Sequence, residues 1–205
     1  MKMLEKPAIQ FIDELSSNAP VPGGGGASAA VGACAAALGM MVTNLTIGKK
    51  KYAVYEDEVK AVRDRLETLR NQLIDLVDGD AVAFEPLSRA YSIPKDDPER
   101  DAIMESALYE ASVVPLKIME TALAAAKELD VLVEKGSRLA ISDVGVGILF
   151  AQAAIEGASL NVTINTTSMK DRARAAELDT KAAAIIAEGA ALKERIYSGV
   201  LAAIK

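Results

Sequence analysis

The sequence predicts an all-α fold, a single-domain bundle of long helices over residues 1–205. Aromatic residues make up only 4% of the chain and Ala is abundant, a composition that favours closely packed helices over a sheet of aromatic and β-branched residues. Apolar residues reach 51%, which is enough to form one sizeable core in a chain of 205 residues. Segments with helical periodicity follow one another without an internal repeat or a long linker.

A glycine-rich segment precedes the first long helix. Residues 7–17 predict a short helix that ends before Pro20, and Gly23 to Gly26 then lead into an uncharged run from Ala27 to Ile47. Glycines let a backbone or a ligand approach the free N–H groups at a helix N-terminus closely, and this is a favourable place for an anion. Tight packing between helices explains the same glycines equally well.

The uncharged run from Ala27 to Ile47 is long enough to cross a membrane. Its residues are mainly small, and Asn44 lies inside it, which favours a buried central helix packed at short range. Cys34, the single cysteine, is therefore expected to be a buried and inert thiol. No apolar leader precedes the run, so we expect a cytoplasmic protein that does not insert into a membrane.

The next two segments predict long helices that contain proline. Apolar residues three and four positions apart, from Val59 to Leu76, predict an amphipathic helix that Pro86 breaks or kinks. Residues 91–98 hold two prolines and predict a loop. Another long helix is expected to begin near Glu99 and to bend at Pro115.

Two further helices complete the prediction. Lys135 to Ser137 predicts a turn, residues 142–164 predict a second nearly uncharged helix rich in small residues, and residues 171–204 predict a terminal helix. The two helices rich in small residues offer more close-packing surface than one amphipathic layer covers, so we expect a homodimer.

The composition also excludes several classes of function. A net charge of −6 argues against nucleic-acid binding, because no broad cationic surface is available for phosphates. The chain has no histidine, so it cannot build a Ser-His-Asp triad or a His-ligated zinc site, and we expect no metal. Residues 24–29 fit G-x-G-x-x-A, but no strand precedes them, and no Gly-Lys-Ser or Gly-Lys-Thr closes a phosphate loop.

Asp80 is the main candidate for acid–base chemistry. It continues the apolar stripe that ends at Leu76, and Phe84 follows one turn later on the same face. A carboxylate in such a position either finds donors or a cation, or its pKa rises and it becomes a potential acid–base group. A buried ion pair with Lys or Arg is the common structural alternative.

Three further groups of polar residues have both a structural and a functional explanation. Ser142 and Asp143 can cap a helix. Lys49 to Lys51 can form a solvated helix end, or can hold the carboxylate tail of a ligand near the glycine loop. Asn161 and Asn165 lie one turn apart and can bind the polar edges of a ring, or can make caps and turns.

Five motifs in order carry a resemblance to a known family: SSNAPVPGGG, NLTIGKKKY, DGDAVAF, ISDVGVG and GASLNVTIN. Together they resemble the cyclodeaminase domain of formiminotransferase-cyclodeaminase and its stand-alone bacterial relatives, which include methenyltetrahydrofolate cyclohydrolases. The resemblance covers nearly the whole chain.

The resemblance implies a homodimeric all-α subunit, a folate site near the glycine loop, and one-carbon chemistry on a tetrahydrofolate derivative without a tightly bound cofactor. It implies catalytic roles for Asp80, Lys51 and Asp143. The substrate-binding residues that it implies are Gly23, Gly24, Gly25, Lys50, Tyr52, Phe84, Ser142, Asn161 and Asn165.

The chain departs from the family pattern at two places. Gly26 stands where relatives commonly have Ser, and residues 136–139 read Gly-Ser-Arg-Leu where relatives often have Gly-Asn-x-Asn. The departures support an alternative hypothesis, a non-catalytic folate-binding or scaffold subunit of the same fold. The sequence does not distinguish cyclohydrolase from cyclodeaminase chemistry, since the same acid–base residues serve both.

Overall fold

The computed structural model describes residues 2–205, and in that range every regular element is a helix. This confirms the predicted all-α fold. The α-helices are α1 (Ala8–Leu15), α2 (Gly24–Thr46), α3 (Glu56–Ala90), α4 (Arg100–Lys135), α5 (Ile141–Ser168) and α6 (Arg172–Ile204), and three 3₁₀ segments are η1 (Met3–Glu5), η2 (Lys50–Tyr55) and η3 (Arg138–Ala140).

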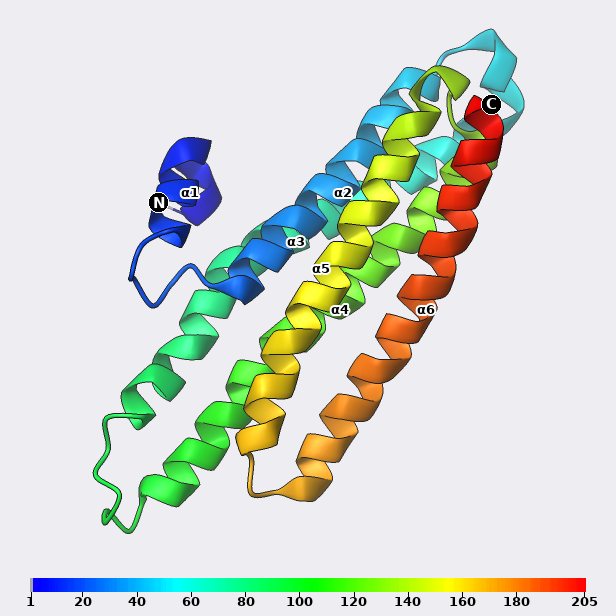
Figure 1. The fold of residues 1–205 in the computed structure, drawn as a ribbon. Helices are drawn as coiled ribbons and strands as arrows, with labels where there is room; N and C mark the ends of the chain where they lie inside the picture. The colour runs from blue at the N-terminus through cyan, green and yellow to red at the C-terminus, as the bar shows by residue number, and fades with distance from the viewer. Residues whose placement is uncertain (1) are drawn as a thin grey trace.

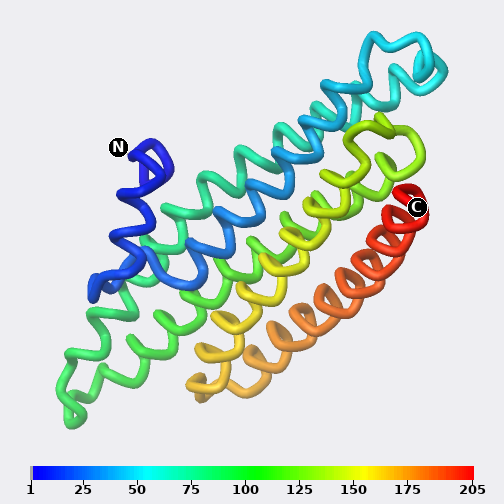
Figure 2. The backbone as a smooth tube through the Cα atoms, turned by 45° about the horizontal axis from the view of Figure 1, so that its top comes forward, coloured from blue at the N-terminus to red at the C-terminus, as the bar shows by residue number. Residues whose placement is uncertain are grey.

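The five long helices, α2 to α6, run up and down side by side in an elongated bundle (Figures 1 and 2). Helix α4 lies inside the bundle and contacts each of the other four, while α2 packs on α3, α4 and α5. Helices α2 and α5 lie next to each other. They run in opposite directions, because successive helices are joined at the bundle ends and alternate in direction (Figure 1).

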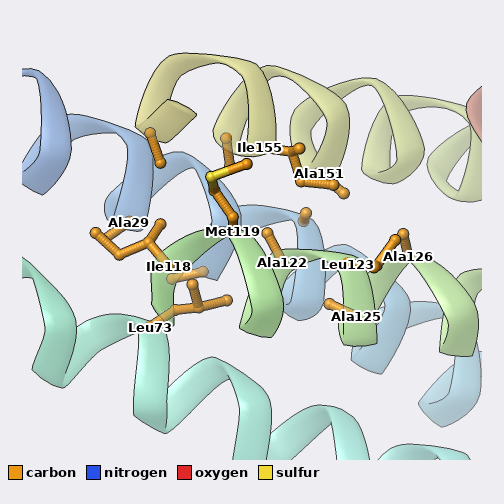
Figure 3. Packing of buried hydrophobic residues seen from close by; sticks show 14 of the residues in the cluster. Ala29, Leu73, Ile118, Met119, Ala122, Leu123, Ala125, Ala126, Ala151 and Ile155 are labelled. Carbon is orange, nitrogen blue, oxygen red and sulfur yellow. The ribbon is translucent and has the colours of Figure 1, made fainter. Parts of the chain in front are cut away.

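Small residues let the long helices approach closely. Figure 3 shows Ala122 and Ala151 among larger buried side chains such as Met119 and Ile155. A Cβ atom at Gly39 of α2 would lie 2.8 Å from a terminal methyl group of Leu66 in α3, so a side chain at this position would force the Leu66 side chain to move. The close helix packing predicted from the small residues is confirmed at this point.

Helix α2 is buried on one side only. Cys34 is exposed, so the prediction of a buried thiol is wrong. The exposed stripe of α2 lies beside a similar stripe of α5, and its large apolar members are Val31, Met41, Leu45, Val146, Leu149, Phe150, Leu160 and Ile164. Helix α2 contains no charged residue and α5 contains only Asp143 and Glu156. We call this surface the α2/α5 face.

Two stretches of the described chain are long and apolar enough to span a membrane: Gly24–Thr46 and Arg138–Ser168. In each, 56% of the most apolar window is buried inside the bundle. Core helices of globular proteins satisfy the same criterion of length and composition, because they too are apolar around most of their circumference.

Helix α3 continues through Pro86 to Ala90, so the proline does not break it. Proline removes one N–H donor, which normally pairs with the carbonyl four residues earlier. That carbonyl belongs to Val82, a residue that is 69% exposed, so water can replace the lost donor. Helix α4 likewise continues through Pro115, but there both the proline and Ala111, the residue four positions earlier, are buried.

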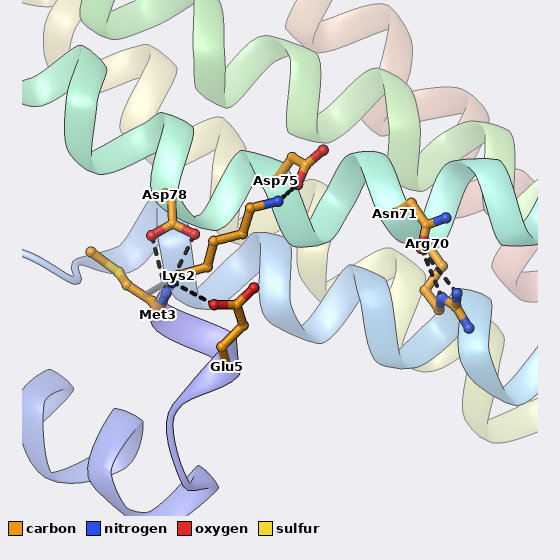
Figure 4. Close-up of polar contacts among 7 residues, drawn as sticks. All are labelled: Lys2, Met3, Glu5, Arg70, Asn71, Asp75 and Asp78. Atoms are coloured by element: carbon orange, nitrogen blue, oxygen red, sulfur yellow. Dashed lines mark hydrogen bonds and ion pairs between the residues drawn. The ribbon is translucent and has the colours of Figure 1, made fainter.

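The N-terminal segment lies against α3 before α1 departs from the bundle (Figures 1 and 4). The backbone N–H of Met3 donates to Asp78 at 3.1 Å, and the Lys2 ammonium pairs with Asp75 at 2.6 Å. Helix α1 leaves Ile9 and Ile12 largely exposed. The segment from η1 to the glycine run therefore passes along the same end of α3 that carries Asp80.

Candidate active site

The Asp80 carboxylate lies against the first turn of α2. Asp80 belongs to the second half of α3, and its Oδ2 atom accepts a hydrogen bond of 2.9 Å from the N–H of Gly26. This N–H is one of the donors that a helix leaves unpaired at its N-terminus. The partial positive charge of the helix end also favours a nearby carboxylate.

Gly25 is the residue that permits this approach. A Cβ atom there would lie 2.2 Å from Asp80 Oδ1 and 2.5 Å from its Cγ, well inside van der Waals contact. The backbone of α2 and the carboxylate of α3 can meet only because this position has no side chain. The functional explanation of the glycine run and the packing explanation thus apply to the same residue.

A pocket of about 130 Å³ opens beside Asp80. The residues that line it are Pro20, Val21, Gly23, Gly24, Asp80, Phe84, Ala111, Pro115, Asn161, Ile164 and Asn165. A second hollow of about 280 Å³ shares Pro20, Val21 and Phe84 with the first, so the two adjoin. Six of the predicted site residues, from the glycine run, α3 and α5, therefore line this pocket, and a seventh, Gly25, lies against Asp80.

Burial raises the pKa of Asp80, and the hydrogen bond from Gly26 offsets part of this rise. No Lys or Arg side chain pairs with Asp80 within residues 2–205, and none lines the pocket. The alternative of a buried ion pair therefore has no partner in the described chain. What remains is a carboxylate with a raised pKa in a pocket, the usual arrangement of a general acid or base.

Asn161 and Asn165 lie inside α5 rather than at a helix end, so they do not act as caps. The Asn161 amide nitrogen donates to the Gly157 carbonyl at 3.0 Å, and its side chain lies beside Gly24. The Asn165 amide nitrogen donates to the Ala111 carbonyl of α4 at 2.9 Å. Both amides thus line the pocket with their nitrogens already bound to backbone carbonyls.

The remaining predicted residues lie at the opposite end of the bundle. Lys50, Lys51 and Tyr52 belong to η2, which follows the C-terminal end of α2, and a helix of 23 residues is about 34 Å long. The expectation that this corner lies near the glycine loop is therefore wrong within one chain. The glycine run and η2 are close in sequence but far apart in space, because the long helix α2 separates them.

Around Tyr52 the basic corner has an ordered structure. The Tyr52 hydroxyl accepts a hydrogen bond of 2.9 Å from the Arg138 N–H, and this bond, together with the nearby Lys51 ammonium, lowers the pKa of Tyr52. The Lys51 ammonium lies 5.5 Å from the centre of the Tyr52 ring. Ser142 and Asp143 occupy the first turn of α5 at this same end, and neither makes a side-chain cap.

Comparison with known proteins places the chain in a family. The family model described as formiminotransferase-cyclodeaminase matches residues 7–184. The chain belongs to this family. A protein of Methylorubrum extorquens named methenyltetrahydrofolate cyclohydrolase is 42% identical over 194 residues, which cover 93% of each chain.

Other relatives of the formiminotransferase-cyclodeaminase family extend the comparison. The formimidoyltransferase-cyclodeaminase of Sus scrofa is 31% identical over 91% of this chain, which corresponds to 35% of the pig protein. The crystal structure of the formiminotetrahydrofolate cyclodeaminase of Thermotoga maritima superimposes with a TM-score of 0.92, at 27% identity and over the whole of both chains.

Several lining residues of the pocket were not predicted from the sequence. Pro20, Val21 and Ile164 supply apolar surface, and Ala111 and Pro115 come from α4. The proline in α4 was a usable signal, because a proline within a helix leaves the carbonyl four residues earlier without its usual donor. The sequence alone does not show which neighbouring helix supplies the replacement.

Proposed function

We propose that the protein is a tetrahydrofolate one-carbon enzyme that acts as a methenyltetrahydrofolate cyclohydrolase. The observation that carries this proposal is the half-buried Asp80 carboxylate, which has no ion-pair partner among residues 2–205 and lies in a pocket at the glycine-rich start of α2. The Methylorubrum extorquens relative, which matches over nearly the full length of both chains, bears this name and supports this choice of reaction.

Asp80 is suited to the proton transfers of the reaction. A water oxygen forms a bond to the electrophilic carbon of the cationic methenyl bridge, and Asp80 takes the proton that the water loses. The tetrahedral centre then collapses as its bond to one folate nitrogen breaks, and that nitrogen receives a proton. A carboxylate beside the bridge also stabilises the cation electrostatically.

Formiminotetrahydrofolate cyclodeaminase is the second candidate, because the Thermotoga maritima structure superimposes on the whole chain. In that reaction the folate N10 atom attacks the formimino carbon and ammonia leaves. This path also passes through a tetrahedral centre and needs proton transfer, so Asp80 serves either reaction. A non-catalytic folate-binding subunit is the alternative that turnover assays distinguish.

Replacing Asp80 with Asn tests the proposal. Asn keeps the shape of the side chain and accepts the Gly26 hydrogen bond, but it does not take up a proton, so turnover should fall about 10²–10⁴-fold. Steady-state assays with methenyl- and formimino-tetrahydrofolate measure this, with folate binding followed in parallel. A variant within a few-fold of wild type on both substrates removes Asp80 from the catalytic role, and a wild type that turns over neither removes the enzyme assignment.

We further propose that the site is completed by a second copy of the chain, in a homodimer formed through the α2/α5 face. This face measures roughly 34 Å by two helix diameters, or about 700 Å² per subunit. A standard protein interface buries about 800 Å² per partner, so the face has the extent that a stable dimer requires. Its apolar and nearly uncharged surface fits a second copy of itself.

Charge determines the orientation of this proposed dimer. Lys49, Lys50, Lys51 and Arg138 form no ion pair within residues 2–205, whereas the pocket at the other end holds Asp80 and no cation. An antiparallel pairing of the two faces places the basic corner of one subunit over the pocket of the other. A parallel pairing places like charges together and is disfavoured.

In the antiparallel dimer, the basic corner of the second subunit lies next to Asp80 of the first, although the two are far apart within one chain. Lys51 is positioned to orient the attacking water, with Tyr52 and Asp143 beside it, and Lys50 is positioned to bind the carboxylate tail of folate.

We propose a cytoplasmic location and one functional domain over residues 1–205, without a tightly bound cofactor. The relative of matching length supports the single-domain proposal, and the chemistry above requires only groups that the chain supplies. The apolar α2/α5 face is assigned to the dimer rather than to a membrane.

A further inference from the structure

The interior of α4 contains a carbonyl group that cannot find its usual partner. In an α-helix the carbonyl of residue 111 accepts a hydrogen bond from the N–H of residue 115. Residue 115 is Pro, which has no N–H, and both Ala111 and Pro115 are buried. A buried carbonyl without a donor costs free energy, so the neighbouring structure must supply one.

Asn165 of α5 supplies the missing donor. Its Nδ2 atom lies 2.9 Å from the Ala111 oxygen, and the Asn165 side chain is buried between the helices. A carbonyl oxygen only accepts hydrogen bonds, so the amide must present its nitrogen and not its oxygen to α4. Pro115 thereby determines which way round the Asn165 amide lies.

The orientation of the Asn165 amide determines which of its atoms is free in the pocket. Asn165 lines it, and its Oδ1 atom accepts no hydrogen bond from the described residues. Asn161 lies in the same orientation, because its Nδ2 atom is bound to the Gly157 carbonyl. Each amide therefore uses one of its two N–H donors on a backbone carbonyl, while its Oδ1 atom accepts no hydrogen bond from the described residues. Together with the Asp80 carboxylate, these oxygens give the pocket three side chains with acceptors for a ligand.

We propose that Pro115 is a positioning residue for substrate recognition: it orients Asn165 so that the pocket selects a flat heterocycle with N–H donors along its edge. The proposal rests on the proposed function, whose folate substrates carry such an edge on their pterin ring. It adds that the specificity comes from a missing backbone donor in α4, which holds the Asn165 nitrogen at the Ala111 carbonyl and leaves the Oδ1 atom as the acceptor for a ligand.

The direct test is Pro115→Ala. Ala at this position restores the helical N–H, which pairs with the Ala111 carbonyl and releases the Asn165 amide to rotate. We expect the KM for methenyltetrahydrofolate to rise about 3–10-fold, the range for one lost oriented hydrogen bond, with kcat within about two-fold of wild type. The Tm should stay the same or rise, because a helix tolerates Ala better than Pro. Pro86→Ala is the matched control, since it makes the same change inside α3 outside the pocket and should leave KM unchanged.

A double-mutant cycle separates orientation from simple contact with the proline ring. Asn165→Ala should raise KM and also lower the Tm, because it leaves the Ala111 carbonyl unpaired. Adding Pro115→Ala should recover the Tm and leave KM no higher than in Asn165→Ala alone. The proposal would be overturned if the KM of the double variant equalled the product of the two single effects, or if Pro115→Ala left KM unchanged. It would also be overturned if the Tm of the double variant stayed as low as that of Asn165→Ala.

The thermal part of the cycle does not depend on activity. If the wild type turns over neither folate, the proposed function fails, while recovery of the Tm in the double variant still supports the pairing of Asn165 with the Ala111 carbonyl. The dissociation constant of 5-formyltetrahydrofolate then replaces KM as the measure of recognition. An equal constant for wild type and Pro115→Ala would contradict the recognition role.

Discussion

Asp80 combines a raised pKa with a hydrogen bond that keeps its charged form accessible. Burial favours the neutral acid, while the N–H of Gly26 and the N-terminus of α2 favour the carboxylate. The site therefore contains an influence that favours each of the two protonation states of this carboxyl group. This is the property that a general base for water requires.

The raised pKa also predicts how stability depends on pH. A folded-state pKa above the unfolded value of 3.8 means that the contribution of Asp80 to stability is fully present below that value and is lost as pH rises through the folded pKa. Asn carries no charge at any of these pH values. We therefore expect Asp80→Asn to be at least as stable as wild type at pH 7, with the difference disappearing as the pH approaches about 4.

Urea unfolding of both proteins between pH 4 and 8 measures this difference. If Asp80 instead balanced a buried cation, Asp80→Asn would leave that cation unpaired. The free energy of unfolding would then fall by about 3–5 kcal/mol at neutral pH. Such a loss would show that the carboxylate has a structural role.

At the scale of elements, the site depends on how closely the first turn of α2 approaches α3. Gly25→Ala places a methyl group 2.2 Å from Asp80 Oδ1, so the carboxylate must move away from Gly26 or the helices must separate. We expect kcat to fall at least about ten-fold and the free energy of unfolding to fall by about 1–3 kcal/mol.

Gly79→Ala is the control for this prediction. Gly79 precedes Asp80 in α3, and a Cβ atom there would have its nearest neighbour at 4.0 Å. The substitution should raise stability by up to about 1 kcal/mol through helix propensity and should leave kcat unchanged. If Gly79→Ala lowered kcat as much as Gly25→Ala, the close contact between α2 and Asp80 would not be the reason for either effect.

At the scale of the whole molecule, the proposed antiparallel dimer can be tested by mixing two inactive variants. Asp80→Asn and Lys51→Met would damage opposite ends of the same composite site. Random pairing after joint refolding yields about half mixed dimers, each with one intact site of two, so the mixture should recover about a quarter of wild-type activity. A mixture no more active than its separate components would contradict a site shared between subunits, as would a fully active Lys51→Met variant.

Cys34 offers a readout that does not need activity. It is exposed near the middle of α2, on the α2/α5 face, so an antiparallel pairing about a two-fold axis places it next to its own copy. A short bis-maleimide should therefore join two subunits, and Cys34→Ser should abolish the product. Light scattering at micromolar concentration should give the dimer mass, and a monomer would contradict the proposed interface.

The sequence by itself determined the helices and the faces of those helices. The predicted starts near Glu99, Ser142 and Asp171 lie within one residue of α4, α5 and α6, because apolar periodicity and stop signals act over a few residues. For the same local reason Asp80 and Phe84 were predicted on one face of α3, and both line the pocket. Pro86 was a weaker signal, since a helix can continue where water replaces the missing donor.

Only the tertiary structure decided what each face meets. It placed Asp80 against Gly25 and Gly26 rather than against a cation, and it separated Lys51 from that site by the length of α2. It also left Cys34 exposed and paired Asn165 with a carbonyl of α4. The physical reason is that the pairing of helices depends on contacts between residues far apart in the chain, which local periodicity does not encode.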